Sequence, residues 1–274
     1  MFHCGRFQFA LDRPLIMGIV NVTPDSFSDG GLCLDPAAAI EHGRRLVAEG
    51  ADILDIGGES TRPGAQPVPL EEEIERVIPV VEGLRDVGVA LSVDTMKPEV
   101  MRAALAAGAD MINDVNALRA PGAWAAVRDG HCGLCLMHMQ GTPRTMQQAP
   151  YYDDVVAEVH TFLQQRIMEA QAQGIARERL LIDPGFGFGK SLEHNIALFK
   201  HIAVLAETAP VLVGVSRKSM LGAITGRPVH ERLVASVVAA VLAAQAGAAV
   251  LRVHDVAATR DALRLLQALG GKTG

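Results

Sequence analysis

Short apolar runs alternate with longer segments of helical periodicity along the whole chain, and this alternation limits the possible folds more than any other feature. The runs are rich in Val, Ile and Leu, which is typical of parallel strands buried on both faces. The expected strands are Leu15–Val22, Ala51–Gly57, Ala90–Asp94, Asp110–Val115, Gly133–Met139, Leu180–Asp183, Pro210–Ser216 and Ala249–Val256. The expected helices are Pro36–Glu49, Leu70–Val87, Pro98–Ala107, Pro121–Asp129, Asp153–Gln173, Leu192–Thr208, Leu233–Gln245 and Ala258–Leu269.

A succession of strand–helix units of this kind predicts an α/β fold, and more specifically a single (β/α)8 TIM barrel. The chain has 274 residues, and such a barrel takes about 250. No stretch rich in Pro, Ser or Gly divides the sequence, so we expect one domain over residues 1–274. A doubly wound open sheet uses the same alternation and is the alternative architecture.

Charge and aromatic content argue against a nucleic-acid partner. The chain has 25 Lys and Arg against 31 Asp and Glu, a formal net charge of −6, and only 4% aromatic residues. Binding to a phosphate backbone needs a basic surface, and base stacking needs aromatic platforms. We therefore expect no binding to nucleic acid.

One uncharged stretch, Leu233–Leu251, approaches the length of a membrane span. It consists largely of alanine, contains Ser236 and Gln245, and is interrupted by Gly247. We therefore expect a buried helix, a glycine stop and a strand in its place. The first 13 residues contain no long apolar run, so no secretory signal and no membrane association are expected.

Cys132 and Cys135 form a C-x-x-C pair in a chain with four cysteines. Structural zinc usually needs four convergent ligands, and no second pair accompanies this one. Cys135 also lies within an expected strand, whose alternation would place the two thiols on opposite faces. We therefore expect buried, reduced thiols of a cytoplasmic protein and no metal or redox site.

Nearly every expected strand ends in a polar side chain. The residues concerned are Asn21, Asp55, Glu59, Asp94, Asn113, Asp114, His138, Asp183, Arg217, Lys218, Arg252 and His254. The carboxyl ends of barrel strands form the active site, so this concentration predicts a polar ligand. Carboxylates and amides dominate the third, fourth and sixth strands, and cations the last two. This segregation indicates a ligand with N–H donors at one end and an anionic group at the other.

Two long loops and one glycine-rich run add to the expected site. The loops cover residues 23–35 and 58–69, and such lengths are typical of lids or binding loops. The run Gly185–Ser191 resembles a nucleotide-binding P-loop, but its first glycine would have to stand at Pro184, so the spacing fails. We expect these glycines to let the backbone approach a flat ligand, with Phe186 or Phe188 packed nearby.

Eight motifs lie at or beside the expected strand ends. They are MGIVNVTPDSFSDGG at Met17–Gly31, DIGGESTRPGA at Asp55–Ala65, SVDT at Ser92–Thr95, IND at Ile112–Asp114, MHMQG at Met137–Gly141, DPGFGFGK at Asp183–Lys190, GVSRKS at Gly214–Ser219 and RVHDV at Arg252–Val256. In this order, they resemble the motifs of the bacterial dihydropteroate synthases, the targets of sulfonamide drugs. The resemblance runs from about Phe7 to the last expected helix, and no motif position departs from the family pattern.

The resemblance implies a barrel enzyme of folate biosynthesis. Such a transferase joins 4-aminobenzoate to 6-hydroxymethyl-7,8-dihydropterin pyrophosphate, giving 7,8-dihydropteroate and pyrophosphate. It also implies Mg²⁺ dependence, a cytoplasmic location and a homodimer. The alanine-rich segment Leu233–Gln245 is the candidate dimer interface.

The motifs also imply roles for individual residues. The implied pterin-binding residues are Asp94, Asn113, Val115, Met137, Asp183 and Lys218. The implied pyrophosphate-binding residues are Asn21, Arg62, Arg252 and His254, with Asn21 also near Mg²⁺ as its metal ligand. The implied aminobenzoate pocket is Phe27, Thr61, Pro63, Phe188 and Ser219. The catalytic candidates are Asp94, Asp183, Lys218, Arg252 and His254, and Asp25 and Asp29 are further candidates near the metal.

A pyrophosphate on a CH₂ group attached to an electron-rich ring can leave before the nucleophile attacks. Mg²⁺ and the cationic side chains Arg62, Arg252 and His254 would stabilise the leaving group. Asp94 and Asp183 would stabilise the cationic pterin, and the two long loops would exclude water.

The alternative function is a pterin-dependent methyltransferase domain that uses methyltetrahydrofolate and a corrinoid partner. It would share the barrel and the pterin carboxylates. The SFSDGG segment together with Lys218, Arg252 and His254 favours pyrophosphate chemistry instead. A sugar-phosphate aldolase with Lys218 as a Schiff-base amine is a third hypothesis, which the neighbouring Arg217 disfavours.

Overall fold

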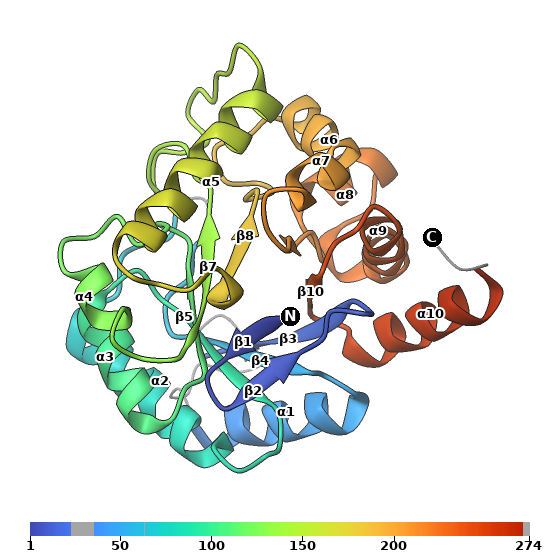
Figure 1. Cartoon of the computed structure of the whole chain (residues 1–274). Helices are drawn as coiled ribbons and strands as arrows, with labels where there is room; N and C mark the ends of the chain where they lie inside the picture. The colour runs from blue at the N-terminus through green and yellow to red at the C-terminus, as the bar shows by residue number, and fades with distance from the viewer. Residues whose placement is uncertain (23–35, 63, 271–274) are drawn as a thin grey trace.

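A parallel barrel forms the centre of the protein (Figure 1). The structure is a computed structural model that describes residues 1–22, 36–62 and 64–270. In this part of the chain the main sheet has eight strands in the order β8-β7-β6-β5-β4-β3-β10-β9. They are β3 (Leu15–Asn21), β4 (Ile53–Gly57), β5 (Ala90–Asp94), β6 (Met111–Asp114), β7 (Gly133–Met137), β8 (Leu180–Asp183), β9 (Leu212–Val213) and β10 (Val250–Val253). A parallel bridge between Ile182 and Val211 joins β8 to β9, so the predicted barrel is confirmed and the open sheet is excluded.

Helices surround the strands as a ring in Figure 1. They are α1 (Pro36–Glu49), α2 (Leu70–Leu84), α3 (Pro98–Ala107), α4 (Ala123–Val127), α5 (Val155–Ala172), α6 (Leu192–Lys200), α7 (Ile202–Ala206), α8 (Ser219–Thr225), α9 (Leu233–Gln245) and α10 (Val256–Leu269). Short 3₁₀ helices lie at Arg177–Arg179 and Val229–Glu231.

Local sequence signals start and stop several of these helices. α3 begins with Pro98 and ends at Gly108, which adopts a left-handed conformation with φ of 111°. The side chain of Asp154 caps α5 by accepting hydrogen bonds from the N–H groups of Val156 and Ala157. These caps satisfy backbone groups that have no partner within the helix, and therefore fix where each helix begins or ends.

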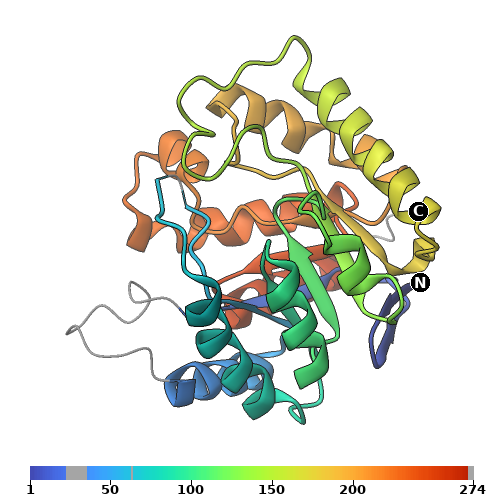
Figure 2. The ribbon, with the colours of Figure 1, turned by 90° about the vertical axis from the view of Figure 1, so that its left-hand side faces the viewer.

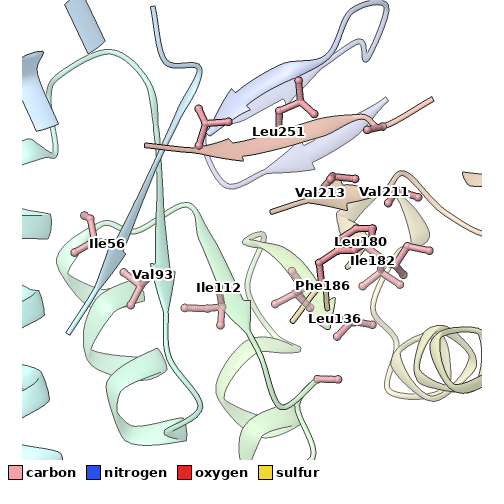
Figure 3. Packing of buried hydrophobic residues seen from close by; sticks show 14 of the residues in the cluster. Ile56, Val93, Ile112, Leu136, Leu180, Ile182, Phe186, Val211, Val213 and Leu251 are labelled. Carbon is pink, nitrogen blue, oxygen red and sulfur yellow. The ribbon is translucent and has the colours of Figure 1, made fainter. Parts of the chain in front are cut away.

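The side chains of each strand alternate between the helices and the barrel interior. On β4, Leu54 and Ile56 belong to the core between strands and helices, part of which Figure 3 shows. Ile53 belongs instead to the core inside the barrel, and Asp55 on the same face bonds to Ser92 of β5. This period of two divides every strand into a helix-facing and an interior face.

An N-terminal hairpin that the sequence pattern does not predict closes one end of the barrel. Its strands, β1 (Phe2–Cys4) and β2 (Phe7–Phe9), pair antiparallel. Phe2 is fully buried in the interior core with Leu15, Met111 and Leu181. Gly133 allows this close contact, because a Cβ there would lie 2.7 Å from Phe2 Cζ. Figure 2 shows the hairpin at the opposite end of the barrel from the loop that follows β4.

Several predicted elements have the wrong bounds. The helix predicted over Leu192–Thr208 is two helices, α6 and α7, which meet at His201. The strand predicted over Pro210–Ser216 is reduced to β9, and α8 was not predicted. The final strand ends at Val253, and α10 starts at Val256, two residues before the predicted start.

The uncharged stretch Leu233–Leu251 forms the helix, glycine stop and strand that the sequence predicts, but the prediction that this helix is buried is wrong, because Val234, Val238 and Leu242 are exposed. It forms α9, a glycine at position 247 with φ of 94°, and the first part of β10. Within the described residues, no helix has both the length and the hydropathy that a bilayer crossing requires.

The two thiols of the C-x-x-C pair lie on opposite faces of the barrel wall, as predicted. Cys132 packs in the helix-facing core and Cys135 in the interior core, and both are free. Burial raises the pKa of both thiols, so neither is a reactive thiolate near neutral pH.

Candidate active site

The polar side chains that the sequence predicts at the strand ends converge inside the barrel, at the end opposite the N-terminal hairpin. The strand register places Gly57 of β4 beside Asp94 of β5, and Asp94 beside Asn113 of β6. Met137 of β7 similarly pairs with Asp183 of β8. The parallel register therefore brings residues that are far apart in the sequence to one level of the barrel.

Arg252 lies between two buried carboxylates of this end. Its Nε donates to Asp55 Oδ2 at 2.6 Å and its Nη2 donates to Asp94 Oδ2 at 3.0 Å. Burial would lower the pKa of Arg252, but Asp55 and Asp94 raise it, so the guanidinium is charged. The other oxygen of Asp94, Oδ1, is buried and has no hydrogen-bond partner within the described residues. It is an acceptor available to a ligand.

Asp94 has an unusual protonation equilibrium. Burial raises the pKa of this carboxyl to about 7, and Arg252 opposes the shift while Asp55 adds to it. An approaching pair of N–H donors favours the ionised form, because a carboxylate accepts hydrogen bonds from both oxygens. Ligand binding and ionisation of Asp94 are therefore linked.

Asp183 and Lys218 carry opposite charges and lie close enough to shift each other's pKa. Asp183 Oδ1 accepts a hydrogen bond from the N–H of Gly185 at 2.7 Å. Burial raises the pKa of Asp183, and Lys218 lowers it. Burial also lowers the pKa of Lys218 to about 8, which Asp183 partly offsets. Lys218 Nζ donates to the carbonyl oxygen of Phe186 at 2.5 Å and lies 4.7 Å from the ring centre of Phe188.

An apolar wall lies beside these charges. Val115, Met137 and Phe188, all predicted to contact substrates, pack in one cluster. The same cluster contains Met96, Met139 and Met146, for which the sequence suggested no role. Methionine side chains adapt to flat ligands because they are unbranched and polarisable.

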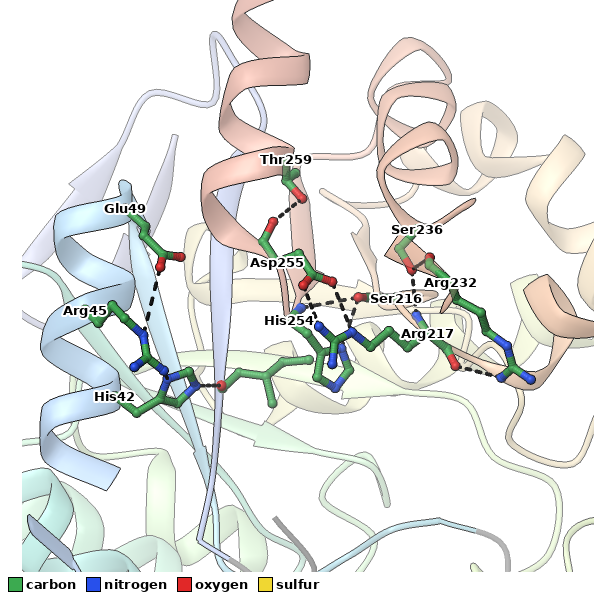
Figure 4. Close-up of polar contacts among 11 residues, drawn as sticks. His42, Arg45, Glu49, Ser216, Arg217, Arg232, Ser236, His254, Asp255 and Thr259 are labelled. Carbon is green, nitrogen blue, oxygen red and sulfur yellow. Dashed lines mark hydrogen bonds and ion pairs between the residues drawn. The ribbon is translucent and has the colours of Figure 1, made fainter. Parts of the chain in front are cut away.

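His254 lies just beyond the end of β10, next to the loop that follows β9 (Figure 4). The hydroxyl oxygen of Ser216 is 3.0 Å from His254 Nδ1 and accepts from the His254 backbone N–H at 3.3 Å. Arg217 forms an ion pair with Asp255 beside them. Burial, Arg252 and Arg217 lower the pKa of His254 to about 3. His254 is therefore neutral near pH 7 in the free protein, whereas its place on the last strand suggested a cation.

The glycine-rich loop after β8 is shaped by contact with another loop. Gly185, Gly187 and Gly189 all have positive φ. A Cβ on Gly185 would lie 1.9 Å from the carbonyl oxygen of His138, and one on Gly189 2.7 Å from that of Gln140. Gly185 and Gly189 therefore allow a close approach to the loop after β7, whereas a Cβ on Gly187 would meet only Lys218 Cδ, at 3.6 Å. The approach of this backbone to a flat ligand stays a prediction.

Lys190 stabilises this glycine-rich loop through hydrogen bonds to backbone carbonyl oxygens. Its buried ammonium lies 2.9 Å from His138 Nδ1 and donates to the carbonyl oxygens of Phe188 and His138. Burial lowers the pKa of Lys190 to about 7 and that of His138 to about 2, so the histidine is neutral and accepts. The Lys of the motif thus holds backbone and does not act as a phosphate-binding P-loop lysine.

The remaining predicted residues are less enclosed. Asn21 ends β3 and is partly buried. Thr61 is partly exposed, and Arg62 and Ser219 are exposed, in the loop after β4 and at the start of α8. Phe27 and Pro63, with the further candidates Asp25 and Asp29, lie outside the described residues.

Asp55 is the main polar residue at this end for which the motifs suggested no role. It has no exposed surface, and it accepts hydrogen bonds from three donors on three other strands, β5, β6 and β10. The signal was present in the sequence, because Asp55 and Gly57 share the interior face of a strand in the way that Ser92 and Asp94 do.

Comparisons with known proteins agree with this site. A family model described as "Pterin binding enzyme" matches residues 17–254. The chain is 50% identical over 260 residues to dihydropteroate synthase of Escherichia coli K12, covering 94% of this chain and 92% of the relative.

Two solved structures are also similar. One is the Xanthomonas albilineans dihydropteroate synthase with 4-aminobenzoic acid, with a TM-score of 0.90, 61% identity and 94% of each chain covered. The other is the enzyme of the same organism in complex with 7,8-dihydropteroate, with a TM-score of 0.86, 57% identity and 95% of each chain covered. The fold, the converging strand-end residues and these matches agree that the chain belongs to the pterin-binding enzyme family and, within it, to the dihydropteroate synthases.

Proposed function

We propose that the protein condenses 4-aminobenzoate with 6-hydroxymethyl-7,8-dihydropterin pyrophosphate, giving 7,8-dihydropteroate and pyrophosphate. The relatives named above supply the reaction, since their structures hold 4-aminobenzoic acid and 7,8-dihydropteroate. This is a transferase step of folate biosynthesis, and both substrates are small molecules.

The observation that carries this function is the set of buried acceptors beside the partly buried cations Lys218 and Arg252. Asp94, Asn113 and Asp183 end neighbouring parts of the barrel wall and are at least nine-tenths buried. Their oxygens suit the amino and ring N–H groups of a pterin, and the apolar wall with Met137 suits its ring faces. Arg252 connects this acceptor set to His254, since it donates to Asp94 and lowers the pKa of His254.

In the reaction, the bond between the pterin CH₂ and the pyrophosphate oxygen breaks, and pyrophosphate leaves with the electron pair. Arg252 and Arg62 offer positive charge to the leaving group, and His254 offers a hydrogen bond from its ring. Asp183 and Asp94 stabilise the positive charge that develops on the pterin. The amino nitrogen of 4-aminobenzoate then forms the new bond to the CH₂ group and loses a proton.

Magnesium fits the chemistry of the residues present. The ion prefers oxygen ligands and usually keeps waters and substrate phosphate oxygens beside one or two protein ligands. Asn21 offers an amide oxygen that points toward the end of β4, where it lies 4.0 Å from the position of a Cβ built on Gly57. Within the described residues no group of three or more His, Cys, Asp or Glu could hold a metal. We propose that Asn21 and the pyrophosphate share the ion, which would neutralise charge on the leaving group.

A pyrophosphate-release assay tests the function directly. Release that needs both substrates, with formation of dihydropteroate, is the expected result. Methyl transfer from methyltetrahydrofolate to a corrinoid without pyrophosphate release would instead support the methyltransferase alternative. Borohydride should trap no adduct on Lys218, since the aldolase hypothesis requires one and this reaction does not.

Asp183→Asn tests the role given to the carboxylate charge. The amide keeps the size of the side chain and removes its negative charge. We expect kcat to fall by about 100-fold, because a preorganised charge that stabilises the transition state is lost. An unchanged kcat would contradict the role of Asp183 in stabilising the cationic pterin.

A homodimer through α9 is the proposed assembly. The helix exposes Val234, Val238 and Leu242, at 73%, 52% and 49% of their surfaces, along one stripe at spacings of four residues. Sedimentation velocity should show a dimer that Val238→Asp converts to a monomer. Val204→Asp, at an exposed position on α7, is the matched control and should leave the dimer intact.

We also propose a cytoplasmic location. The free, buried thiols of Cys4, Cys132 and Cys135 suit a reducing compartment. Cell fractionation with an antibody to the protein would test this, and recovery in the membrane or secreted fraction would contradict it.

A further inference from the structure

Asp55 lies one layer below the residues that would contact the pterin. The register pairs Asp55 with Ser92, whereas the next interior position of β4, Gly57, pairs with Asp94. The Asp55 side chain has no exposed surface, so it is covered by other groups of the protein and does not reach the ligand. Its influence on the reaction must pass through its neighbours.

Three donors from three other strands converge on the Asp55 carboxylate. The Ser92 hydroxyl donates to Oδ1 at 2.6 Å. Asn113 Nδ2 donates to Oδ2 at 3.1 Å, and Arg252 Nε donates to the same oxygen at 2.6 Å. An ionised carboxylate only accepts hydrogen bonds, so Ser92, Asn113 and Arg252 must each turn an N–H or O–H group toward Asp55.

This arrangement decides which end of the Asn113 amide faces the ligand. Because Nδ2 is engaged by Asp55, the amide oxygen is the end left for the pocket, and no hydrogen bond among the described residues reaches it. The reverse orientation would place two oxygens against each other. Asp55 therefore makes Asn113 an acceptor for the N–H groups of a ligand.

The same carboxylate orients Arg252. With Nε on Asp55 and Nη2 on Asp94, the planar guanidinium is fixed at two of its donor positions. Asp94 in turn keeps its Oδ2 on Arg252 and its Oδ1 without a partner within the described residues. Asp55 thus acts on two acceptor oxygens without a hydrogen-bond partner among the described residues, directly on that of Asn113 and through Arg252 on Asp94 Oδ1.

We propose that Asp55 is a positioning residue that sets the specificity of the pterin site, because it turns Asn113 and, through Arg252, Asp94 into acceptors for N–H groups. The inference rests on the proposed function and extends it to a residue that does not touch the substrate. Its contacts with donors from three other strands are the basis for assigning this role to Asp55.

The test compares Asp55→Ala with Asp55→Asn in the full-length protein. In Asp55→Asn the amide oxygen can accept from Arg252 and Asn113 while the amide nitrogen donates to the Ser92 hydroxyl, so the geometry survives. We expect Asp55→Ala to raise the Kd and KM for the dihydropterin pyrophosphate by about 20-fold, because two donors lose their acceptor and the amide turns. Asp55→Asn should raise them by less than about fivefold, and the KM for 4-aminobenzoate should change by less than about twofold in both.

A double-mutant cycle with Asn113→Ala separates positioning from general loss of structure. If Asp55 acts through Asn113, the loss caused by Asp55→Ala should shrink at least about threefold in the Asn113→Ala background. Ser92→Ala is the matched control, since it removes one hydrogen bond from Asp55 and touches neither partner. It should change pterin binding by less than about threefold. Asp55→Ser replaces Asp55→Ala in the cycle if the alanine variant does not fold.

Three results would overturn the proposal. These are pterin binding by Asp55→Ala within about threefold of the wild type, equal losses for the Ala and Asn variants, and an undiminished loss in the Asn113→Ala background. Failure of the proposed function is distinguishable, because it would appear in the wild type as no formation of dihydropteroate from the two substrates, whatever the Asp55 variants do.

Discussion

The two ends of the barrel interior are lined by the same strands, yet they hold opposite kinds of side chain. At the end that the hairpin closes, the interior residues are apolar, and two positions further along β4, β6, β8 and β10 they are polar. The pairs are Ile53 and Asp55, Met111 and Asn113, Leu181 and Asp183, and Val250 and Arg252. A step of two residues keeps a side chain on the same face of a strand, so both sets point into the barrel.

The difference shows how one barrel separates stability from chemistry. Burial of the apolar end contributes the hydrophobic free energy of folding. Burial of the charged end contributes little or opposes folding, because removing charges from water costs about as much as their pairing returns. Substitutions at the charged end should therefore act on catalysis, and on stability as well where they leave a buried charge unpaired. Substitutions at the apolar end should act mainly on unfolding.

Arg252→Met should give the largest effect at the charged end. The variant keeps a long side chain and removes the donors to Asp55 and Asp94. We expect kcat/KM for the dihydropterin pyrophosphate to fall by about 10²- to 10³-fold, because a preorganised charge is lost. The matched control is Arg102→Met on the surface of α3, where the one ion pair of Arg102 within the described residues is with exposed Glu99, and its activity should equal that of the wild type. Wild-type activity in Arg252→Met would contradict the assignment of catalysis to the charged end of the barrel.

Leu181→Ala should give the largest effect at the apolar end. Leu181 is fully buried in the interior core, two residues before Asp183. We expect its truncation to lower the free energy of unfolding by about 3 kcal/mol, through lost burial and the remaining cavity. The kcat measured well below the unfolding temperature should stay within about twofold. A tenfold loss of kcat would show that packing at the apolar end also affects catalysis at the charged end.

The pH dependence of pterin binding should sharpen the comparison further. Asp94 has a pKa of about 7, so it is protonated as the pH falls below that value. The ionised form accepts N–H groups, and affinity should therefore fall by up to about tenfold for each pH unit below 7. Calorimetry with 6-hydroxymethylpterin, which carries no titrating pyrophosphate, measures this. Asp94→Asn should bind weakly with no such slope, and a slope that survives in this variant would assign the proton to another group.

Ser216→Ala should give the smallest effect. The Ser216 hydroxyl contacts Nδ1 of the neutral His254 ring and thereby favours the form whose Nε2 carries the proton. Its loss should lower kcat/KM by about threefold, with little change in the KM for 4-aminobenzoate. Ser216→Thr retains a hydroxyl and should restore most of the activity. Equal activity in the alanine and threonine variants would mean that the hydroxyl has no role.

Strong local patterns predicted much of the fold. The strands Ala90–Asp94 and Leu180–Asp183 and the helices Pro36–Glu49 and Leu233–Gln245 have the bounds that the sequence indicates. The hairpin at Phe2–Phe9 could not be predicted in the same way. Its strands have three residues each and are stabilised by packing beneath the barrel, not by their own periodicity.

The sequence was enough to predict which residues form the candidate site, but not which of them contact one another. The pattern of polar strand ends was enough to identify Asp94, Asn113, Asp183 and Arg252, and the motifs implied their roles. The sequence alone did not indicate that Arg252 is engaged by two carboxylates, or that Lys190 holds a backbone loop. Such contacts depend on distances between strands that are remote in the chain.

The sequence by itself determined the strand–helix alternation, the period-two placement of polar residues at the strand ends, and the family. These properties depend on side-chain type and local spacing, which the chain carries without folding. Only the tertiary structure decided that Asp55 meets Arg252 across 197 positions of sequence, that His254 is neutral, and that Asp94 ionises near pH 7. Burial and neighbouring charge set those properties, and both exist only once the barrel has closed around the groups.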